Sequence, residues 1–255
     1  MKHSYLKTLV LATYLLLISA ASYAQKKGDN IIKLNVPALF FKNFSVQYER
    51  AVGKKQSFAV AVRYRPDGKI PFQKTVEDFV DDKSIRIDLA KIGNFGITPE
   101  YRFYFSKKGA TNGFYIGPFI SYNYYNGNVP INYNDYDDIN HVSIEKTAIF
   151  KGSANSFTAG FQVGAQWKLS DKFSLDWWIV GPNYGISNGT FDFVGSLNDI
   201  EQISMQYELE KIKNTIPLLK IEIADGSPNP NGATFKVNGP WAGLRAMGIC
   251  IGYRF

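Results

Sequence analysis

The residues best suited to catalysis lie in one segment near the middle of the chain. His141 is followed by Ser143 and Glu145 in the stretch NHVSIE, and a serine activated by a histidine can act as a nucleophile in hydrolysis or acyl transfer. Closeness in sequence does not establish the geometry of a catalytic triad. A solvated loop histidine is the simpler interpretation of His141. We therefore expect a protein that is not an enzyme.

Residues that bind metals are scarce. The chain contains 2 histidines and 1 cysteine, Cys250, which is too few for a zinc cluster or an internal disulfide. The stretch NYNDYDDIN, residues 132–140, offers oxygen ligands for calcium, but no register fits the spaced ligands, central glycine and closing glutamate of an EF-hand loop. We expect a solvated loop whose tyrosines, Tyr133 and Tyr136, suit contacts with another protein, and we expect no cofactor.

Charged side chains are more numerous, and they need regular elements to position them. The chain has 29 Lys and Arg residues and 22 Asp and Glu residues, which gives a formal net charge of +7. The basic excess is spread along the chain, and no basic run is interleaved with aromatic residues. Nucleic acid is therefore not an expected partner. What the charges do depends on the face of the element that carries them.

Apolar and polar residues alternate along much of the chain. In SFAVAVRYR, every second residue from Phe58 to Tyr64 is large and apolar, whereas Arg63 and Arg65 belong to the opposite set. Alternation with period two is typical of half-buried β-strands. The sequence predicts eight such strands, at residues 31–36, 43–52, 57–65, 95–105, 114–124, 157–169, 173–181 and 248–255.

The connections between these strands fall into two classes. Short and long connections alternate, so antiparallel strands would place every short turn at one end and every long loop at the other. Bacterial outer-membrane barrels have this asymmetry, with short periplasmic turns and long outer loops. The short connections are residues 53–56, 106–113 and 170–172; the long ones are 66–94, 126–155 and 186–239, with 37–43 as a short member of the long class.

The last long loop contains a predicted helix. The stretch SLNDIEQISMQYELEKIKNTI begins with Ser196, a favourable N-cap residue, and carries two apolar stripes on nearly opposite sides. A helix with two apolar sides requires two contacts, such as a barrel mouth and another loop or a partner. Residues 218–237 beyond it are typical of a hairpin. The stripes are Leu197, Ile200, Ile203 and Tyr207, and Met205, Leu209, Ile212 and Ile216.

The apolar faces distinguish a soluble barrel from a membrane barrel. Directed inward, they would crowd aromatic side chains into a closed eight-stranded barrel, which has little room. Directed outward, they form two aromatic belts around an aliphatic band, which matches the two interfaces and the hydrocarbon of a bilayer. We therefore expect an all-β, eight-stranded antiparallel transmembrane β-barrel, with a lipocalin-like soluble barrel as the alternative. The loop-end belt would comprise Tyr64, Phe95, Tyr122, Tyr124, Phe157 and Trp241.

The opposite faces of the predicted strands are polar, and we expect their charges to meet inside the barrel. Side chains fill the interior of an eight-stranded barrel, and a buried charge without a partner is strongly disfavoured. Arg63 and Glu100 lie on neighbouring predicted strands, so we expect these two to pair. The predicted interior charge network is Glu49, Arg63, Glu100, Arg102 and Asp176.

The first residues predict export. Lys2 and Lys7 form a short basic region before an apolar core at residues 9–18, and a small-residue pattern ending at Ala24 predicts cleavage before Gln25. No later stretch reaches the roughly 18 apolar residues that a spanning helix needs. The sequence therefore predicts a signal peptide at residues 1–24 and one barrel domain at residues 25–255.

The chain ends on GICIGYRF, which continues the alternation to the last residue. This ending resembles the C-terminal recognition strand of outer-membrane proteins, which the barrel-assembly machinery reads. The mature chain as a whole resembles the small eight-stranded, OmpX-like outer-membrane barrels of Bacteroidota. The resemblance implies the outer membrane as the location, and membrane lipids and the assembly machinery as partners. Arg245 departs from the pattern, because strict alternation turns it towards lipid. The predicted assembly signal is Met247, Ile249, Ile251, Tyr253 and Phe255.

Three functional hypotheses remain open. The leading one is a non-enzymatic integral outer-membrane protein with a plugged polar interior, which acts structurally or binds a surface protein or glycan through its long loops. The second is a small passive pore or uptake channel. The third is an outer-membrane lipid-modifying enzyme that uses His141.

Deleting Phe255 should leave export intact but impair insertion, because the terminal aromatic residue belongs at the membrane interface and resembles the end of the assembly signal. The measurement is the amount of heat-modifiable, protease-resistant barrel in isolated outer membranes. Normal amounts in the deletion variant would contradict the prediction.

Overall fold

The computed structural model describes residues 30–80, 82–137, 142–215, 220–245 and 248–255. The predicted signal peptide, its cleavage site between Ala24 and Gln25, His141, Ile216 and Met247 lie outside these residues. The elements are β1 (Asn30–Asn35), α2 (Val36–Phe40), β2 (Phe44–Gly53), β3 (Gln56–Lys69), α3 (Gln73–Val80), β4 (Lys91–Tyr104), β5 (Gly113–Asp137), β6 (Val142–Lys168), β7 (Phe173–Val180), β8 (Pro182–Val194), α4 (Asp199–Thr215), β9 (Lys220–Ile223), β10 (Gly232–Leu244) and β11 (Gly248–Arg254).

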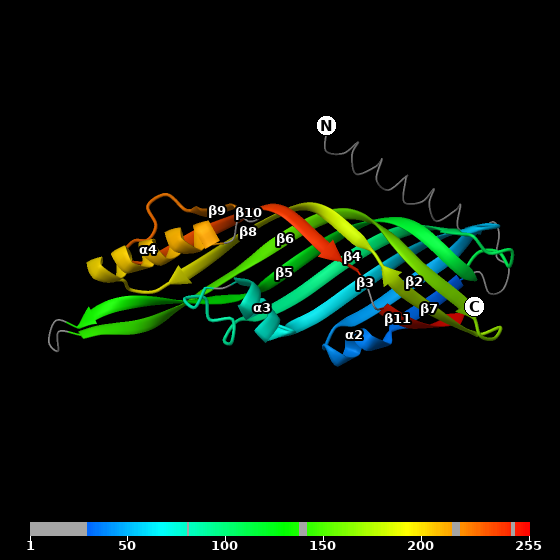
Figure 1. Cartoon of the computed structure of the whole chain (residues 1–255), viewed down its shortest axis with the longest axis horizontal. Helices are drawn as coiled ribbons and strands as arrows, with labels where there is room; N and C mark the ends of the chain where they lie inside the picture. The colour runs from blue at the N-terminus through cyan, green and yellow to red at the C-terminus, as the bar shows by residue number, and fades with distance from the viewer. Residues whose placement is uncertain (1–29, 81, 138–141, 216–219, 246–247) are drawn as a thin grey trace, which may run out of the picture.

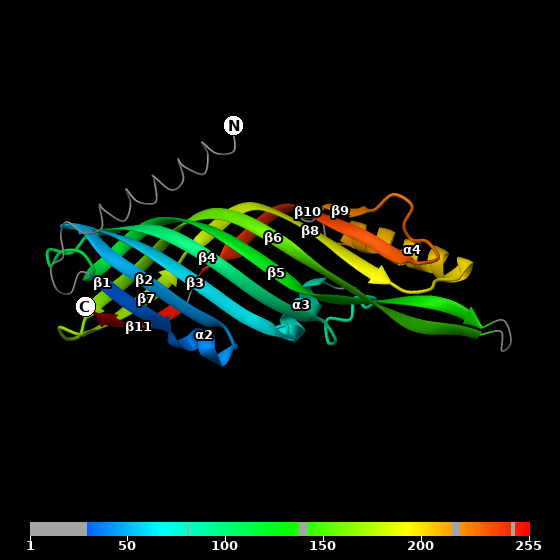
Figure 2. The same ribbon diagram turned by 180° about the vertical axis from the view of Figure 1, so that it is seen from behind.

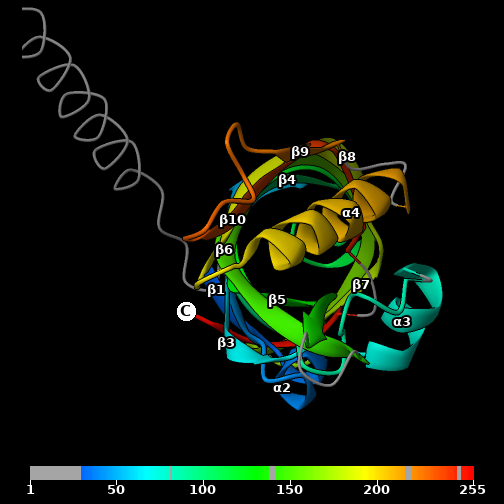
Figure 3. The same cartoon turned by 90° about the vertical axis from the view of Figure 1, so that its left-hand side faces the viewer.

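The strands form one antiparallel sheet that closes on itself. The order of pairing is β5-β4-β3-β2-β1-β11-β7-β6, and β5 pairs with β6 to complete the ring. The chain therefore runs around a barrel, as the view along its axis shows (Figure 3). The last strand, β11, pairs with both β1 and β7, so the C-terminal strand closes the ring. A closed ring leaves no unpaired sheet edge within it.

The described residues form 11 strands, and not the eight that the sequence predicts. The difference comes from β8, β9 and β10, which continue the sheet beyond the ring. Residues 163–168 of β6 pair with β7, whereas residues 151–160 of β6 pair with β8. Gly181 separates β7 from β8, which begins at Pro182, and a proline cannot donate a ladder hydrogen bond. The region 186–239, predicted as a loop, is strand at both ends, and the hairpin predicted within it at residues 218–237 is formed by β9 and β10 over the described residues.

The second long connection is also strand. The sequence predicts a loop at residues 126–155, whereas β5 extends to Asp137 and β6 begins at Val142. The two strands form a hairpin that projects well beyond the ring (Figures 1 and 2). Its inward side is apolar and contacts the helix described next: Ile131, Tyr133, Ala148 and Phe150 are buried there. Packing against α4 therefore stabilises this hairpin.

Helix α4 lies across the loop end of the barrel (Figure 3). Its stripe of Met205, Leu209 and Ile212 is buried in an apolar core with residues of β5, β6, β9 and β10, including Phe150 and Phe235. The other stripe is divided, because Leu197 joins this core whereas Ile200, Ile203 and Tyr207 are exposed. The helix therefore has one contact face and one open apolar face.

The beginning of α4 is fixed by its cap and by an ion-pair cluster. Asn198, rather than the predicted Ser196, caps the helix: its Oδ1 accepts from the backbone N–H of Glu201 at 2.8 Å, and Glu201 Oε2 accepts from the N–H of Asn198 at 2.8 Å. Lys146 Nζ lies 2.7 Å from Asp135 Oδ2 and 2.8 Å from Glu201 Oε1. Hydrogen bonds to these carboxylates raise the pKa of Lys146.

A second ion pair holds the other end of α4. Lys211 Nζ lies 3.0 Å from Asp82 Oδ1. Burial would raise the pKa of Asp82, but hydrogen bonds from Ser84 and Lys211 outweigh it and lower that pKa below its usual value. A lowered carboxylate pKa stabilises the folded state above the unfolded pKa, and the contribution is lost as the pH falls through the folded pKa. Acid therefore loosens this contact.

Leu209→Ala should weaken the docking of α4 by about 2–5 kcal/mol, because it leaves a cavity in a packed core. Ile203→Ala on the same helix is the matched control, since Ile203 is 71% exposed. Amide hydrogen exchange of residues 199–215 measures the effect, and the exchange of ring strands should stay unchanged. Equal exchange in the two variants would contradict the packing described here.

Candidate functional site

A cluster of buried charges occupies the inside of the ring, near its turn end. The cluster comprises Lys33 of β1, Glu49 of β2, Glu100 and Arg102 of β4, and Asp176 of β7, and these five side chains are 0% exposed. All five stand at inward positions of their strands, since their strand neighbours on either side are more exposed. The closed ring thus brings together side chains from four strands, two of which are far apart in the sequence.

The charges of the cluster are paired directly. Lys33 Nζ lies 2.5 Å from Asp176 Oδ2 and also forms an ion pair with Glu49. Arg102 Nη1 lies 2.7 Å from Asp176 Oδ2, and Arg102 Nε lies 2.8 Å from Glu100 Oε1. Asp176 is therefore shared by two cations. Removing any one member would leave an uncompensated charge in a closed interior.

Neutral side chains satisfy the remaining hydrogen-bonding capacity of the carboxylates. Tyr104 Oη lies 2.6 Å from Glu49 Oε1, and Ser57 donates to the same oxygen. The Tyr115 hydroxyl donates to Asp176 Oδ1 at 3.0 Å. The Arg102 guanidinium also stacks over the Tyr115 ring, 4.2 Å from its centroid. Buried ion pairs need such additional bonds to offset their desolvation.

Arg245 also belongs to the cluster through its contact with Glu100, although strict alternation predicts that it faces lipid. Arg245 Nη1 lies 2.8 Å from Glu100 Oε2, and its guanidinium lies over the ring of Trp178 at 3.9 Å. The residue follows the end of β10 at Leu244, so the parity of β10 no longer applies to it. With Arg245, three cations face three carboxylates.

Arg63 lies apart from the cluster, and its predicted pairing with Glu100 is wrong. Arg63 stands opposite Gly96 in the ladder, whereas Glu100 stands opposite Ala59. Arg63 donates to Asn123 Oδ1 instead. The two charges point into the same barrel but at different levels along it. Alternation predicts the face of a residue, but not its level relative to residues on other strands.

The structure adds neutral and cationic members that the predicted network omits. Lys33 alternates with the outward-facing Ile32 and Leu34 on β1, and Tyr104 has the same parity as Arg102 on β4, so the face of each was predictable. Their roles were not, because these residues contact partners on strands distant in sequence. Gln166 of β6 shows this: its Oε1 accepts from Lys33 Nζ at 3.0 Å and lies 2.8 Å from Tyr104 Oη.

The outward face of the ring has the opposite character. Large apolar side chains cover it and are exposed, including Val62, Ile97 and Ile120 in the middle of their strands. Trp241 is an exception to the predicted belt, since its ring packs against Tyr125, with centroids 5.3 Å apart. The exposed aromatic side chains towards the two ends are Tyr48, Phe58, Phe103, Phe105, Phe114, Trp167, Phe173, Tyr253 and Phe255, and Tyr64, Phe95, Tyr122, Tyr124 and Phe157.

The last strand presents the predicted terminal series on this outward face. Ile249, Ile251, Tyr253 and Phe255 are all exposed, and Cys250 between them is buried. Tyr253 also contacts Phe173 on the neighbouring strand, with ring centroids 6.0 Å apart. The series thus continues the apolar outer surface up to the end of the chain.

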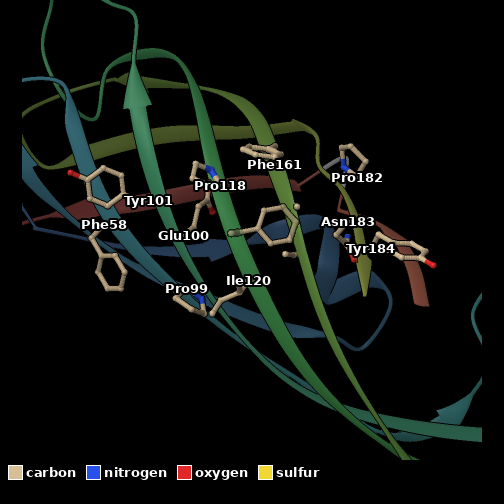
Figure 4. A pocket seen from close by; sticks show the side chains of 13 residues that line it. Phe58, Pro99, Glu100, Tyr101, Pro118, Ile120, Phe161, Pro182, Asn183 and Tyr184 are labelled. Carbon is tan, nitrogen blue, oxygen red and sulfur yellow. The ribbon is translucent and has the colours of Figure 1, made fainter. Parts of the chain in front are cut away.

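An open groove of about 630 Å³ crosses the outward face of β4, β5, β6 and β8 (Figure 4). Three prolines, Pro99, Pro118 and Pro182, line it together with Phe161 and Tyr184. The lining is almost entirely apolar. The groove offers no convergent polar groups of the kind that orient a substrate.

In the described part of the chain, no group of three or more His, Cys, Asp or Glu side chains could hold a metal ion. No helix of the described residues is long and apolar enough to span a membrane. The buried cluster consists of charges paired with one another inside the ring. Glu145, part of the sequence motif with His141, lies on exposed β6 backbone opposite Asn134.

Asp176→Asn should lower the free energy of unfolding by about 3–5 kcal/mol, because Lys33 and Arg102 would share a buried site with one carboxylate fewer. Asp171→Asn is the matched control: the Asp171 side chain is 95% exposed in a turn, so the stability should not change measurably. Denaturant unfolding of the reconstituted protein, followed by tryptophan fluorescence, measures both. Equal stability of the two variants would refute the importance of the cluster.

Comparisons with other proteins give a family and two distant structures. Residues 10–188 match the family described as "Protein of unknown function (DUF3575)". No curated protein matches the chain. The N-terminal β-barrel domain of Pseudomonas aeruginosa OprF is similar at 8% identity and a TM-score of 0.24, with 90% of this chain and 100% of that chain covered. The β domain of the Bordetella autotransporter BrkA is similar at 10% identity and a TM-score of 0.22, with 90% and 99% covered.

Both structural scores are too low to carry an argument about fold or function. The family match carries more weight, because it extends over more than half of the sequence. The chain belongs to the DUF3575 family.

Proposed function

We propose that this protein is an integral outer-membrane β-barrel of OmpX-like architecture, with a plugged interior, that acts structurally or binds a surface partner through its outer elements. The observation that carries the proposal is the inverted burial of the ring. Charged side chains such as Arg102 and Asp176 are fully buried, whereas large apolar side chains such as Ile120 and Phe161 are exposed. Water is a poor solvent for such a surface, and lipid is a good one.

The height of the apolar surface supports a membrane location. From Phe95 to Phe105, the exposed apolar positions of β4 and the residue after it extend over about 33 Å of strand at about 3.3 Å per residue. A strand tilt of about 40° reduces this length to about 25 Å along the barrel axis, the height of the apolar band of outer-membrane barrels. The belts of aromatic residues lie at both ends of this band, as at two membrane interfaces.

The asymmetry of the two ends supports an orientation. The turns between β2 and β3 and between β6 and β7 are short, whereas the β5–β6 hairpin and α4 project from the other end (Figure 1). In outer-membrane barrels, short turns face the periplasm and long elements face outward. Export by a signal peptide at residues 1–24 and recognition of the terminal series by the assembly machinery belong to this proposal, as does an origin among the Bacteroidota.

The filled interior supports a role without conduction. The charge cluster is fully buried around Arg102, and α4 lies across the outer end of the ring. Ions would have to displace paired charges to pass, so a pore is the weaker hypothesis. An enzymatic role would rest on His141 alone. Binding at the cell surface is favoured instead by the exposed stripe of Ile200, Ile203 and Tyr207 on α4, which offers apolar contacts to a protein or glycan.

The purified protein in planar lipid bilayers should therefore give no steady conductance, and deletion of α4 alone should not open it, since the charge cluster lies deeper in the ring. Single-channel current recording makes the measurement, with a porin of known conductance as the positive control. A reproducible ohmic channel in the intact protein would make the pore the primary function.

A further inference from the structure

Three lysines stand in one row across the outer surface of the barrel. In the strand ladders, Lys69 of β3 is opposite Lys91 of β4, Lys91 is opposite Asn128 of β5, and Asn128 is opposite Lys151 of β6. Side chains directly opposite each other lie about 5 Å apart at Cβ. The row therefore presents three ammonium groups and one amide on four consecutive strands.

The lysines of this row are available to a ligand. Lys69, Lys91 and Lys151 are exposed, and within the described residues none of their ammonium groups forms an ion pair. Two carboxylates lie beside the row: Asp67 accepts from Asn126 at 2.7 Å, and Asp192, opposite Lys151, accepts from Thr234 at 2.7 Å. These donors are neutral, so both carboxylates keep their negative charge, and the Lys69–Lys91 pair is the most electropositive part of the row. Like charges placed directly opposite destabilise a sheet, so Lys69 and Lys91 repel each other until an anion lies between them.

The level of the row fits the headgroup region of a bilayer. Lys91 lies beyond the belt residue Phe95 by about 13 Å of strand, or about 10 Å along the axis at a tilt of about 40°. The headgroup region adds about 5–8 Å to each side of the hydrocarbon. Lysine side chains bend towards the phosphate level from positions just outside it. Lys69, the ladder partner of Lys91 on the next strand about 4.8 Å away, lies within about 3 Å of this level at the same tilt.

We propose that the row of Lys69, Lys91, Asn128 and Lys151 binds the phosphate groups of an anionic lipid in the outer leaflet. The inference rests on the proposed membrane location. Ammonium groups bind phosphate as point charges, and clustered lysines at the membrane surface attract anionic headgroups. The spread of the row over four strands favours a headgroup that carries two phosphates over one that carries a single phosphate.

The test compares diphosphoryl lipid A, monophosphoryl lipid A and inorganic phosphate as probes, with binding to the full-length protein in detergent micelles measured by native mass spectrometry. The wild type should prefer the diphosphorylated lipid. The variant K69Q/K91Q/K151Q should lose at least about tenfold in affinity for it, since each lysine contributes to attracting the headgroup. The control K54Q/K107Q/K108Q removes the same charge from the turn end and should bind as the wild type does.

Three results would overturn the lipid site: unchanged binding by K69Q/K91Q/K151Q, an equal loss in the control, or binding of inorganic phosphate at the row that displaces the lipid. The first result would show that the row does not bind the lipid. The second would show that binding depends on the overall charge of the protein, and the third that the row binds free phosphate instead of a lipid. Heat-modifiable mobility of every variant verifies the fold. Failure of the membrane location is seen separately, because such a protein would stay soluble without detergent.

Discussion

The pairing of buried charges is the constraint on which the turn end of the ring depends. Lys33, Arg102 and Arg245 face Glu49, Glu100 and Asp176 inside the ring; the Arg245 side chain is 13% exposed and the other five are 0% exposed. These side chains come from β1, β2, β4, β7 and the residue after β10, so their pairing requires that the ring be closed in one register. A shift of one residue in any of these strands would turn its charges outward. The cluster thus fixes the register and fills the interior.

The barrel reverses its polarity along its length. On β8, Tyr184 and Ile186 are exposed near the ring, whereas Phe191 and Phe193 further out face the apolar core around α4. The next outward positions on β8 are polar, namely Asn188, Thr190 and Asp192. The same sheet is therefore lipid-compatible outside a polar interior at one end, and water-compatible outside an apolar interior at the other. This reversal accounts for a helix packed inside the outer end.

Much of the ring was predictable from the sequence, because alternation with period two determines the face of each residue. The level of a residue is a different matter: Arg63 and Glu100 share a face but not a level, and Lys33 meets Asp176 only through closure of the ring. The extended hairpin of β5 and β6 escaped prediction for a related reason. Its apolar side is satisfied by α4, which follows about 60 residues later in the chain.

The central claim is that the outer face of the ring meets lipid and its inner face does not. Trp177 and Trp178 test it as neighbours on β7: Trp177 is exposed, whereas Trp178 is buried and donates to Asp176 Oδ2 at 3.3 Å. Single-tryptophan variants, with the other tryptophans replaced by Phe, would be placed in vesicles whose acyl chains carry bromine. Bromine should quench the fluorescence of Trp177 strongly and that of Trp178 weakly. Equal quenching of the two, or stronger quenching of Trp178, would contradict the account.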